Sequence, residues 1–444
     1  MPDKLYAHPG GHVFYRKMAH PRPCISHGEG VYLYDRGGKR YLDASGGPIV
    51  VNVGHARAEV VEAMHEQLSA AAYVHASMFT SRALETYCER LAKIVPVKDS
   101  RFFFLSSGSE VVEAAIKLAR QVQLARGEHA RHVIISRTQS YHGMTLGALG
   151  ASGRHGLRQP FLDMMVERPK VPPPYHYRDP RSGKEMAVLV EEAIINADPR
   201  RVAAFLAEPI SGASLGAAVP DEDYWPEVRA ICDRHGVMLI ADEVLVGLGR
   251  TGQMWALDHW AIEPDILVSS KGSAGGYFPL GFVAARGDDV EIIRIADGDF
   301  NHGGTFSHHA VGAAAGLAVL DIIEGEGLVA NAARMGRLLK ERLWARLGDH
   351  PYVGDIRGRG LFVGVELVED KETKRPFPAA RHVASKLHHA AFDQGLIVYY
   401  SQGCVDGERG DVVMFGPPLI VDDSHVDEMV EGLGRALDTL FGPA

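Results

Sequence analysis

The stretch Val237-Met238-Leu239-Ile240-Ala241-Asp242-Glu243-Val244 is an apolar run that leads into two acids. A short, nearly unbroken apolar run predicts a strand that is buried on both faces. Similar runs lie between about Glu59 and Phe300, with helical patterns between them: Arg101 to Leu105, His132 to Ser136, Val202 to Glu208, Ile266 to Ser270 and Gly281 to Ala285. This alternation predicts an α/β fold in which helices cover both faces of a mostly parallel sheet.

The two acids after the quoted run need a partner, because a carboxylate is costly to bury alone. A pyridine nitrogen is one such partner, and Asp242 would keep it protonated so that the ring can accept electrons from a substrate carbon. The alternative is a pair of acids exposed at the carboxyl end of a strand. That end is also where ligands bind in open α/β sheets.

A lysine follows another buried run, Pro264-Asp265-Ile266-Leu267-Val268-Ser269-Ser270-Lys271-Gly272, 29 residues after Asp242. A lone lysine at a strand end is usually a surface charge. In a partly desolvated site its pKa falls instead, and its amine can form an imine with a carbonyl compound. Lys271 is therefore a candidate for covalent binding of a cofactor.

A candidate phosphate site follows the strand Phe102-Phe103-Phe104-Leu105 in the sequence Ser106-Ser107-Gly108-Ser109-Glu110. Ser107 and Glu110 have the spacing of a capping box, which predicts the N-terminus of a helix. Such an end offers free backbone N–H groups and a partial positive charge to a phosphate. Gly108 permits close approach, and Ser107 and Ser109 add hydroxyl donors. The alternative is a plain serine cap without a ligand.

The segment Gly247-Leu248-Gly249-Arg250-Thr251-Gly252 matches the G-x-G-x-x-G pattern of dinucleotide-binding folds. This match supports an alternative function, a nicotinamide-dependent oxidoreductase. The motif should open an amphipathic helix, but residues 253–260 begin one poorly. We therefore expect a turn-rich loop here.

The pattern along the chain predicts two domains. Residues 59–326 form the large domain, and residues 1–58 and 327–444 together form a smaller α+β domain. Within residues 1–58, Gly30 to Asp43 predicts a β-hairpin. Beyond residue 327 we expect long helices over Ala330 to Leu347 and Ser424 to Phe441, with strands near Gly360 to Leu367 and Leu396 to Tyr400. The Pro-rich segment Pro169 to Tyr175 is expected to be a surface loop.

Composition excludes several classes of function. The 444 residues are 46% hydrophobic and 23% charged, and the formal net charge is -9, which argues against nucleic-acid binding. No signal pattern or membrane-length apolar run is present, so we expect a cytoplasmic protein that is not bound to a membrane. Four scattered cysteines, and histidines such as His302, His308 and His309, lack the spacing of a metal site. We expect Arg154 to Arg158 to be solvated surface.

Taken together, these segments resemble the class III aminotransferases, which have the fold type I of pyridoxal 5'-phosphate (PLP) enzymes. The resemblance covers nearly the whole chain. It rests on the segments Asp43 to Asn52, Ser106 to Glu110, Tyr141-His142-Gly143, Glu208-Pro209, Asp242-Glu243-Val244, Gly249 to Gly252, Lys271 and His302 to Phe306. It implies a large domain with a mostly parallel central sheet and a smaller α+β domain built from both ends of the chain.

The resemblance also implies roles for individual residues. Lys271 binds PLP as a Schiff base and shuttles the proton, with Asp242 and Tyr141 as the other catalytic residues. The cofactor-binding residues it implies are Ser107, Gly108 and Ser109 at the phosphate, Asp242 at the ring nitrogen, Val244 and Tyr141 on the two ring faces, and His142 and Glu208 nearby. Thr305 reaches the phosphate of a neighbouring subunit, which implies a homodimer with shared active sites. Whether dimers pair into tetramers is left open.

Departures from the family pattern bear on the substrate. Ornithine and 4-aminobutyrate members carry a carboxylate-binding arginine where this chain has Met414, and they often carry a glutamine where it has Leu245. Both changes resemble the branch that transfers amino groups from ω-amino acids or amines to pyruvate. Arg409 is the local candidate for binding a carboxylate, although its spacing is shifted and a solvated loop arginine is the alternative. The pocket lining is expected to include Pro48, Ile49, Tyr73, His75 and Phe79.

The leading hypothesis is transfer of an amino group from a primary amine or ω-amino acid to a 2-oxo acid, with pyruvate as the expected acceptor, by a ping-pong mechanism. The same motifs also fit a PLP-dependent racemase or epimerase, an aminomutase or a decarboxylase. Turnover of one amino acid without an acceptor would distinguish these from an aminotransferase.

Overall fold

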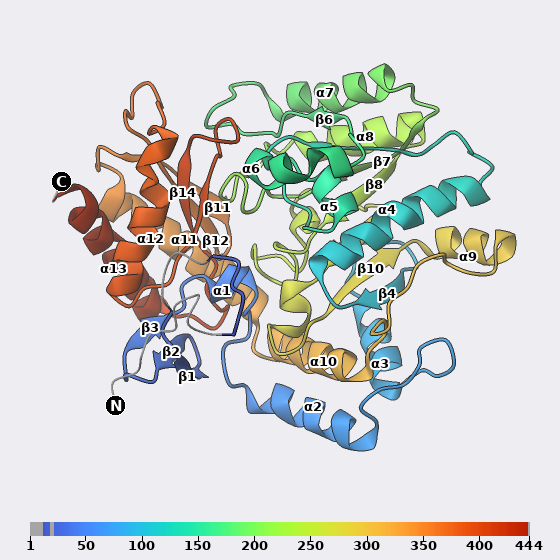
Figure 1. Ribbon diagram of the computed structural model, residues 1–444, viewed down its shortest axis with the longest axis horizontal. Helices are drawn as coiled ribbons and strands as arrows, with labels where there is room; N and C mark the ends of the chain where they lie inside the picture. Colours follow the sequence, from blue (N-terminus) through green and yellow to red (C-terminus); the bar gives the residue numbers. More distant parts are fainter. Residues whose placement is uncertain (1–11, 18–21, 443–444) are drawn as a thin grey trace.

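The fold is described from a computed structural model that covers residues 12–17 and 22–442 (Figure 1). At its centre is a seven-stranded sheet with the order β4-β10-β9-β8-β7-β5-β6. Neighbouring strands from β9 to β6 are parallel, and β10 is antiparallel to both β9 and β4. The strands are β4 (Arg101–Leu105), β5 (Val133–Arg137), β6 (Lys170–Val171), β7 (Val202–Ala207), β8 (Met238–Asp242), β9 (Ile266–Ser269) and β10 (Gly281–Ala285). The predicted mostly parallel sheet is confirmed.

Alternate residues of these strands enter different hydrophobic clusters, as the two-residue period of a strand requires. In β7, Ala204 and Leu206 pack with α4 (Gly108–Ala125), while Phe205 and Ala207 pack with α7 (Gly183–Asn196) and α8 (Tyr224–His235). Both faces are therefore covered, which explains why the strands read as continuous apolar runs. Burial of a large apolar side chain such as Phe205 contributes about 1.5–3 kcal/mol to folding.

The remaining helices surround this layer and the smaller sheet. They are α1 (Gly46–Ile49), α2 (Ala58–Ala70), α3 (Arg82–Leu91), α5 (Leu146–Ala151), α6 (His155–Arg158), α9 (Gly287–Ala296), α10 (Ala310–Gly325), α11 (Leu328–Leu347), α12 (Val383–Asp393) and α13 (Asp423–Phe441). The predicted long helices near residues 330–347 and 424–441 are confirmed as α11 and α13.

Two smaller sheets lie outside the central one. The four-stranded sheet has the order β11-β12-β14-β13, from β11 (Val353–Arg359), β12 (Phe362–Leu367), β13 (Tyr399–Gln402) and β14 (Asp411–Phe415). The three-stranded sheet consists of β1 (Ile25–Glu29), β2 (Tyr32–Asp35) and β3 (Arg40–Leu42), in which β2 and β3 form the predicted hairpin.

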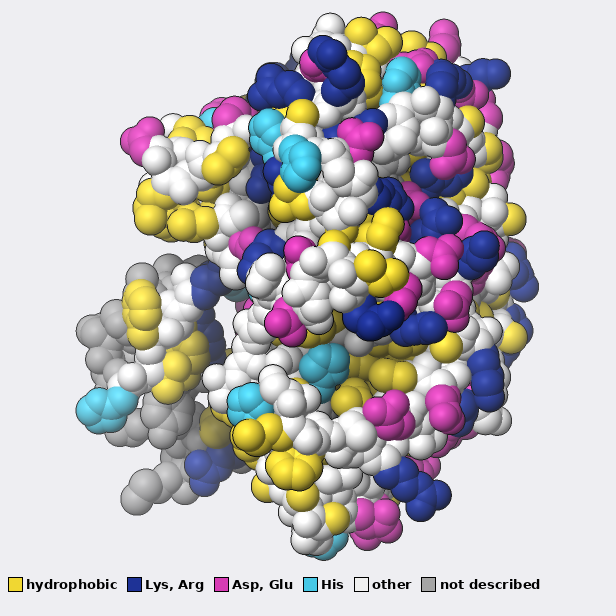
Figure 2. All heavy atoms as spheres, turned by 90° about the vertical axis from the view of Figure 1, so that its right-hand side faces the viewer, with side chains coloured by type: hydrophobic (Ala, Val, Ile, Leu, Met, Phe, Trp, Pro, Cys, Tyr) yellow, Lys and Arg dark blue, Asp and Glu magenta, His cyan; other side chains and the backbone are white. Residues whose placement is uncertain are grey.

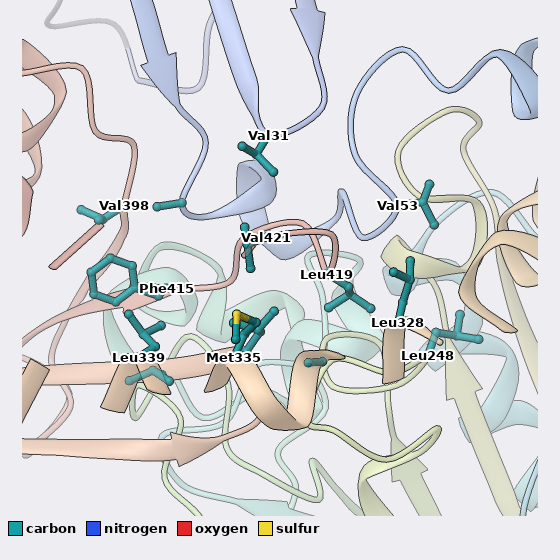
Figure 3. Packing of buried hydrophobic residues seen from close by; sticks show 14 of the residues in the cluster. Val31, Val53, Leu248, Leu328, Met335, Leu339, Val398, Phe415, Leu419 and Val421 are labelled. Carbon is teal, nitrogen blue, oxygen red and sulfur yellow. The ribbon is translucent and has the colours of Figure 1, made fainter. Parts of the chain in front are cut away.

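One hydrophobic cluster joins segments far apart in the sequence. Figure 3 shows Val31 of the N-terminal part above Val421, and Val53 above Leu328 and Leu248. The N-terminal segment is therefore held in place by packing against α11 and the C-terminal region. Because this cluster contains residues of all three predicted ranges, the division at 1–58, 59–326 and 327–444 stays a prediction.

Two local expectations have clear outcomes. Gly247 to Gly252 lies in consecutive turns with no following α-helix, as we expected from residues 253–260. The expectation of a surface loop at Pro169 to Tyr175 is wrong in part. Val171 is buried and pairs with Arg137 as the edge strand β6, and Tyr175 is buried as well.

The surface is mixed in charge. Figure 2 shows lysine and arginine side chains interspersed with aspartate and glutamate over the face that it presents. Within residues 12–17 and 22–442, no helix is long and apolar enough to cross a membrane.

Candidate active site

One cavity lies at the carboxyl ends of β4, β5, β7, β8 and β9, at the edge of the sheet where open α/β folds bind ligands. Each group of lining residues follows a strand directly or within a few residues. The lining residues are Ser107, Gly108 and Ser109 after β4, Tyr141, His142 and Gly143 after β5, Glu208, Ile210 and Ala213 after β7, Asp242, Val244, Leu245 and Val246 at the end of β8, and Lys271 after β9. The structure thus brings together nine of the residues predicted from sequence: Ser107, Gly108, Ser109, Tyr141, His142, Glu208, Asp242, Val244 and Lys271.

Lys271 is held in an unusual backbone conformation. Its φ is 44°, in the left-handed region that residues with a side chain rarely adopt and that is concentrated at functional sites. Hydrogen bonds fix the turn around it, with Ser270 Oγ donating to Leu280 O at 2.8 Å and Ser273 Oγ to Ser270 O at 3.0 Å. Burial of its amino group lowers the pKa of Lys271 to about 8, although the negative charges of Asp242 and Glu208 oppose that shift. A neutral, nucleophilic amine is therefore accessible near neutral pH.

The two acids after β8 face different surroundings. Asp242 lines the cavity, where its Oδ2 lies 2.7 Å from His142 Nδ1 and its Oδ1 accepts the N–H of Val244 at 3.1 Å. Glu243 is turned away and accepts the N–H groups of Ala256 and Leu257, each at 2.9 Å. Burial raises the pKa of Glu243 to about 8. Only Asp242 can therefore meet a ligand in the cavity.

His142 and Glu208 form the wall behind Asp242. Glu208 accepts N–H groups from Gly212 at 3.0 Å and Tyr141 at 3.4 Å, and burial raises the pKa of its carboxyl. The His142 ring is fully buried, and its Nε2 has no hydrogen-bond partner among the described residues. With Nδ1 on Asp242, this ring fixes the orientation of the carboxylate.

The N-terminus of α4 forms the opposite end of the cavity. Ser107 caps the helix, accepting the N–H of Glu110 at 3.3 Å, while Glu110 Oε2 accepts the N–H of Ser106 at 2.9 Å. The helix start at this position is confirmed, although the glutamate reaches one residue further back than in a capping box. A Cβ at Gly108 would lie 3.0 Å from Val244 Cγ1, so glycine keeps this end open.

These groups fit PLP in kind and in order. The helix end supplies backbone N–H groups and positive potential for a phosphate. The oriented Asp242 carboxylate suits a protonated ring nitrogen, Val244 and Tyr141 offer an apolar and an aromatic surface to a ring, and Lys271 offers an amine.

Other predicted residues lie outside the cavity. Ile49 is buried, with a φ of 61°, and packs where a side chain at Gly416 would collide with it. Tyr73 and Phe79 are exposed on the loop after α2, and Tyr73 donates a hydrogen bond to the carbonyl of the exposed Thr305 at 2.9 Å. Arg409 is exposed and pairs with Asp406 at 2.6 Å. The substrate role of Ile49, Tyr73, Phe79 and Arg409, and the phosphate contact of Thr305, stay predictions.

The expectation that Arg154 to Arg158 is solvated surface is wrong at both ends, since Arg154 and Arg158 are half-buried. Arg154 donates to Ser401 Oγ at 3.0 Å. Sequence reasoning noted Leu245 for its residue type but missed the apolar lining residues Ile210, Ala213 and Val246. Their positions just after β7 and β8 were the signal that could have identified them.

Comparison with known proteins identifies the family of the chain. The family described as aminotransferase class III matches residues 14–437. The chain is 34% identical to the taurine–pyruvate aminotransferase of Bilophila wadsworthia, over 99% of this chain and 96% of the relative. It is also 34% identical to the diaminobutyrate–2-oxoglutarate transaminase of Halomonas elongata, over 98% and 94%. The crystal structure of the omega transaminase from Pseudomonas jessenii in complex with PMP is similar, with a TM-score of 0.90, 34% identity and coverage of 97% and 96%.

Proposed function

Because this chain belongs to the class III aminotransferases, which use PLP, we propose that it transfers the amino group of a primary amine or ω-amino acid to pyruvate. That the chain is an aminotransferase follows from its family. The donor, the acceptor and the role of each site residue are the parts proposed. The observation that carries them is the single cavity in which Lys271, the His142-bound Asp242 and the N-terminus of α4 meet.

In this proposal each part of the cavity has one task. Ser107, Gly108 and Ser109 bind the phosphate through the helix end, and Asp242 binds the ring nitrogen, with His142 fixing the carboxylate. Val244 and Tyr141 hold the ring between them, and Glu208 supports Tyr141 through its backbone N–H. Such fixed positions matter because catalysis of proton transfer depends on geometry.

When bound, PLP withdraws electrons from the carbon that carries the amino group and so makes the hydrogen on that carbon acidic. Lys271 Nζ then takes this proton and returns it, because it is the basic group in the cavity whose pKa of about 8 lies near neutral pH. The apolar residues Ile210, Ala213 and Val246 limit the entry of water.

The choice of pyruvate rests on the residue type at position 414. Met414, in the position where some relatives have an arginine, is fully buried in β14 and cannot bind a carboxylate. Relatives nevertheless differ in acceptor, as the names of the taurine–pyruvate and diaminobutyrate–2-oxoglutarate enzymes state.

The test is a panel of donors with each acceptor. The PLP-loaded enzyme is given a diamine, β-alanine or taurine together with either pyruvate or 2-oxoglutarate, and alanine and glutamate are measured by chromatography. We expect alanine to form at least about tenfold faster than glutamate. Faster glutamate formation would overturn the proposal that pyruvate is the acceptor. Turnover of a single amino acid without any acceptor would indicate an isomerase or a decarboxylase.

We also propose that the functional unit is a homodimer in which Thr305 of one subunit contacts the cofactor phosphate of the other. Its support is an exposed apolar surface beside Thr305, formed by Tyr73, Met78, Phe79 and Phe306, which are 45–75% exposed. Contiguous exposed apolar residues mark interaction sites.

A further inference from the structure

A second hollow, of about 130 Å³, lies beside the cofactor cavity. The two share a boundary along the chain. Ala213 lines the first and Ser214 the second, and Tyr141 lines the first while Gln139, two residues earlier, lines the second. A substrate that reacts in the cofactor cavity could therefore extend past Tyr141 into this hollow.

Arg154 is the cation of the second hollow. Its guanidinium donates to Ser401 Oγ at 3.0 Å, and within residues 12–17 and 22–442 no carboxylate forms an ion pair with it. Its charge acts on the neighbouring site: burial raises the pKa of Tyr141, while the positive charges of Arg16 and Arg154 oppose the rise. A half-buried arginine with unused donors is suited to a carboxylate.

Ser214 is an independent sign of a ligand in the same hollow. It is 3% exposed, and its hydroxyl has no hydrogen-bond partner among the described residues. A buried hydroxyl without a partner is costly, and a ligand oxygen would relieve that cost. Ser214 and Arg154 thus supply a neutral and a charged donor to one space.

The shape of the loop over the hollow keeps that space open. Gly407 lines it with a φ of 95°, and a Cβ there would lie 3.1 Å from His155 Cβ. Gln139 fixes the same loop by donating to Val405 O at 2.7 Å. Arg409, on this loop, is 56% exposed and bonded through Nε to Asp406, so it is already neutralised by a local partner.

We propose that Arg154 and Ser214 form the subsite that binds the carboxylate of the 2-oxo acid or amino acid substrate, in place of Arg409. This inference rests on the proposed aminotransferase reaction and assigns its specificity for acidic substrates to a different residue. Amines without a carboxylate occupy the cavity without using the subsite.

The first test measures binding without turnover. Isothermal titration of the PLP-loaded enzyme with propanoate, which has a carboxylate but no oxo or amino group, gives a dissociation constant for each variant. We expect Arg154→Ala to weaken binding about 10- to 100-fold, as loss of a hydrogen-bonded charge does. Ser214→Ala should weaken binding about threefold, and the affinity of Arg154→Lys should fall between those of the wild type and Arg154→Ala. Arg409→Ala and Arg16→Ala should change it less than about threefold, since both residues are exposed.

The second test is kinetic and separates this inference from the proposed function. Arg154→Ala should raise the KM for pyruvate about 10- to 100-fold and change the KM for acetaldehyde, which lacks the carboxylate, by less than about threefold. Melting temperatures and bound-PLP absorbance show whether each variant is folded. Unchanged propanoate binding in Arg154→Ala, or a large loss in Arg409→Ala or Arg16→Ala, would overturn the subsite. If the wild-type enzyme does not use pyruvate but binds propanoate through Arg154, only the proposal that pyruvate is the acceptor would be overturned.

Discussion

Among the residues that the structure describes, two lysines have a pKa lowered to about 8 by burial, Lys271 in the cavity and Lys170 on β6. Lys170 donates to Gly150 O at 2.8 Å and does not line the cavity, which makes it a matched control. We expect Lys271→Ala to lose about 100- to 10,000-fold in turnover, whereas Lys170→Ala keeps it. Borohydride reduction followed by peptide mapping should tag residue 271. A tag on any other lysine would show that Lys271 is not the residue that binds PLP.

The same residue sets a pH dependence. Because the pKa of Lys271 is lowered to about 8, its amine is protonated below that pH and neutral above it. Only the neutral amine attacks a carbonyl, so the rate at which apoenzyme takes up PLP should rise roughly tenfold per pH unit below pH 8 and level off above. Visible absorbance after mixing follows this rate. A rise that continues to pH 10 would indicate a lysine with an ordinary pKa.

How well the sequence predicts a site residue depends on the kind of residue. Asp242 and Lys271 could be identified because a charged group after a buried strand is chemically conspicuous. The contact of His142 with Asp242 joins residues 100 positions apart, and no local sequence pattern predicts it. Arg154 was misjudged for the opposite reason. A short polar run resembles surface, and the hydrogen bond from Arg154 to Ser401 of β13 joins residues 247 positions apart.

At the scale of elements, the start of α4 serves both the fold and the ligand. Ser107→Ala removes the cap and should cost about 1 kcal/mol in free energy of unfolding of the apoprotein, measured by urea denaturation. Ser182, which caps α7 away from the cavity, provides the control, and Ser182→Ala should cost a similar amount. Only Ser107→Ala should also weaken PLP binding. Equal PLP affinity in the two variants would mean that this serine is a cap and nothing more.

Strands with long apolar runs were predictable, but the direction of β10 and the existence of the short strand β6 were not. β10 reads like its neighbours, yet it runs antiparallel to both, because an apolar run carries no information about chain direction. β6 pairs through only two residues within a Pro-rich segment, too short for an alternating pattern to register. In both cases tertiary pairing, not local sequence, decides the outcome.

At the scale of the whole molecule, two loops contribute to one exposed apolar region. The loop after α2 and the loop before α10 lie together, with the rings of Tyr73 and Phe306 6.2 Å apart and Tyr73 bonded to Thr305 O. Met78 and Phe79, 75% and 65% exposed, extend the apolar surface. Such exposure is costly in a monomer and becomes favourable when a second copy covers it.

The proposed shared site can be tested by mixing two inactive variants. Lys271→Ala lacks the reactive amine, and Thr305→Ala should bind PLP weakly. If Thr305 serves the neighbouring subunit, a mixed dimer contains one intact site, since the subunit with Lys271 receives a threonine from its partner. Equal mixing, unfolding and refolding should then restore about a quarter of the wild-type activity, because half of the dimers are mixed and each has one working site of two. If Thr305 serves its own subunit, every Lys271-containing site also lacks its threonine, and mixing restores nothing. Mixing Lys271→Ala with Asp242→Asn gives the matched control, because both residues line one cavity of one chain. Every site of this mixed dimer is defective, so mixing should restore no activity.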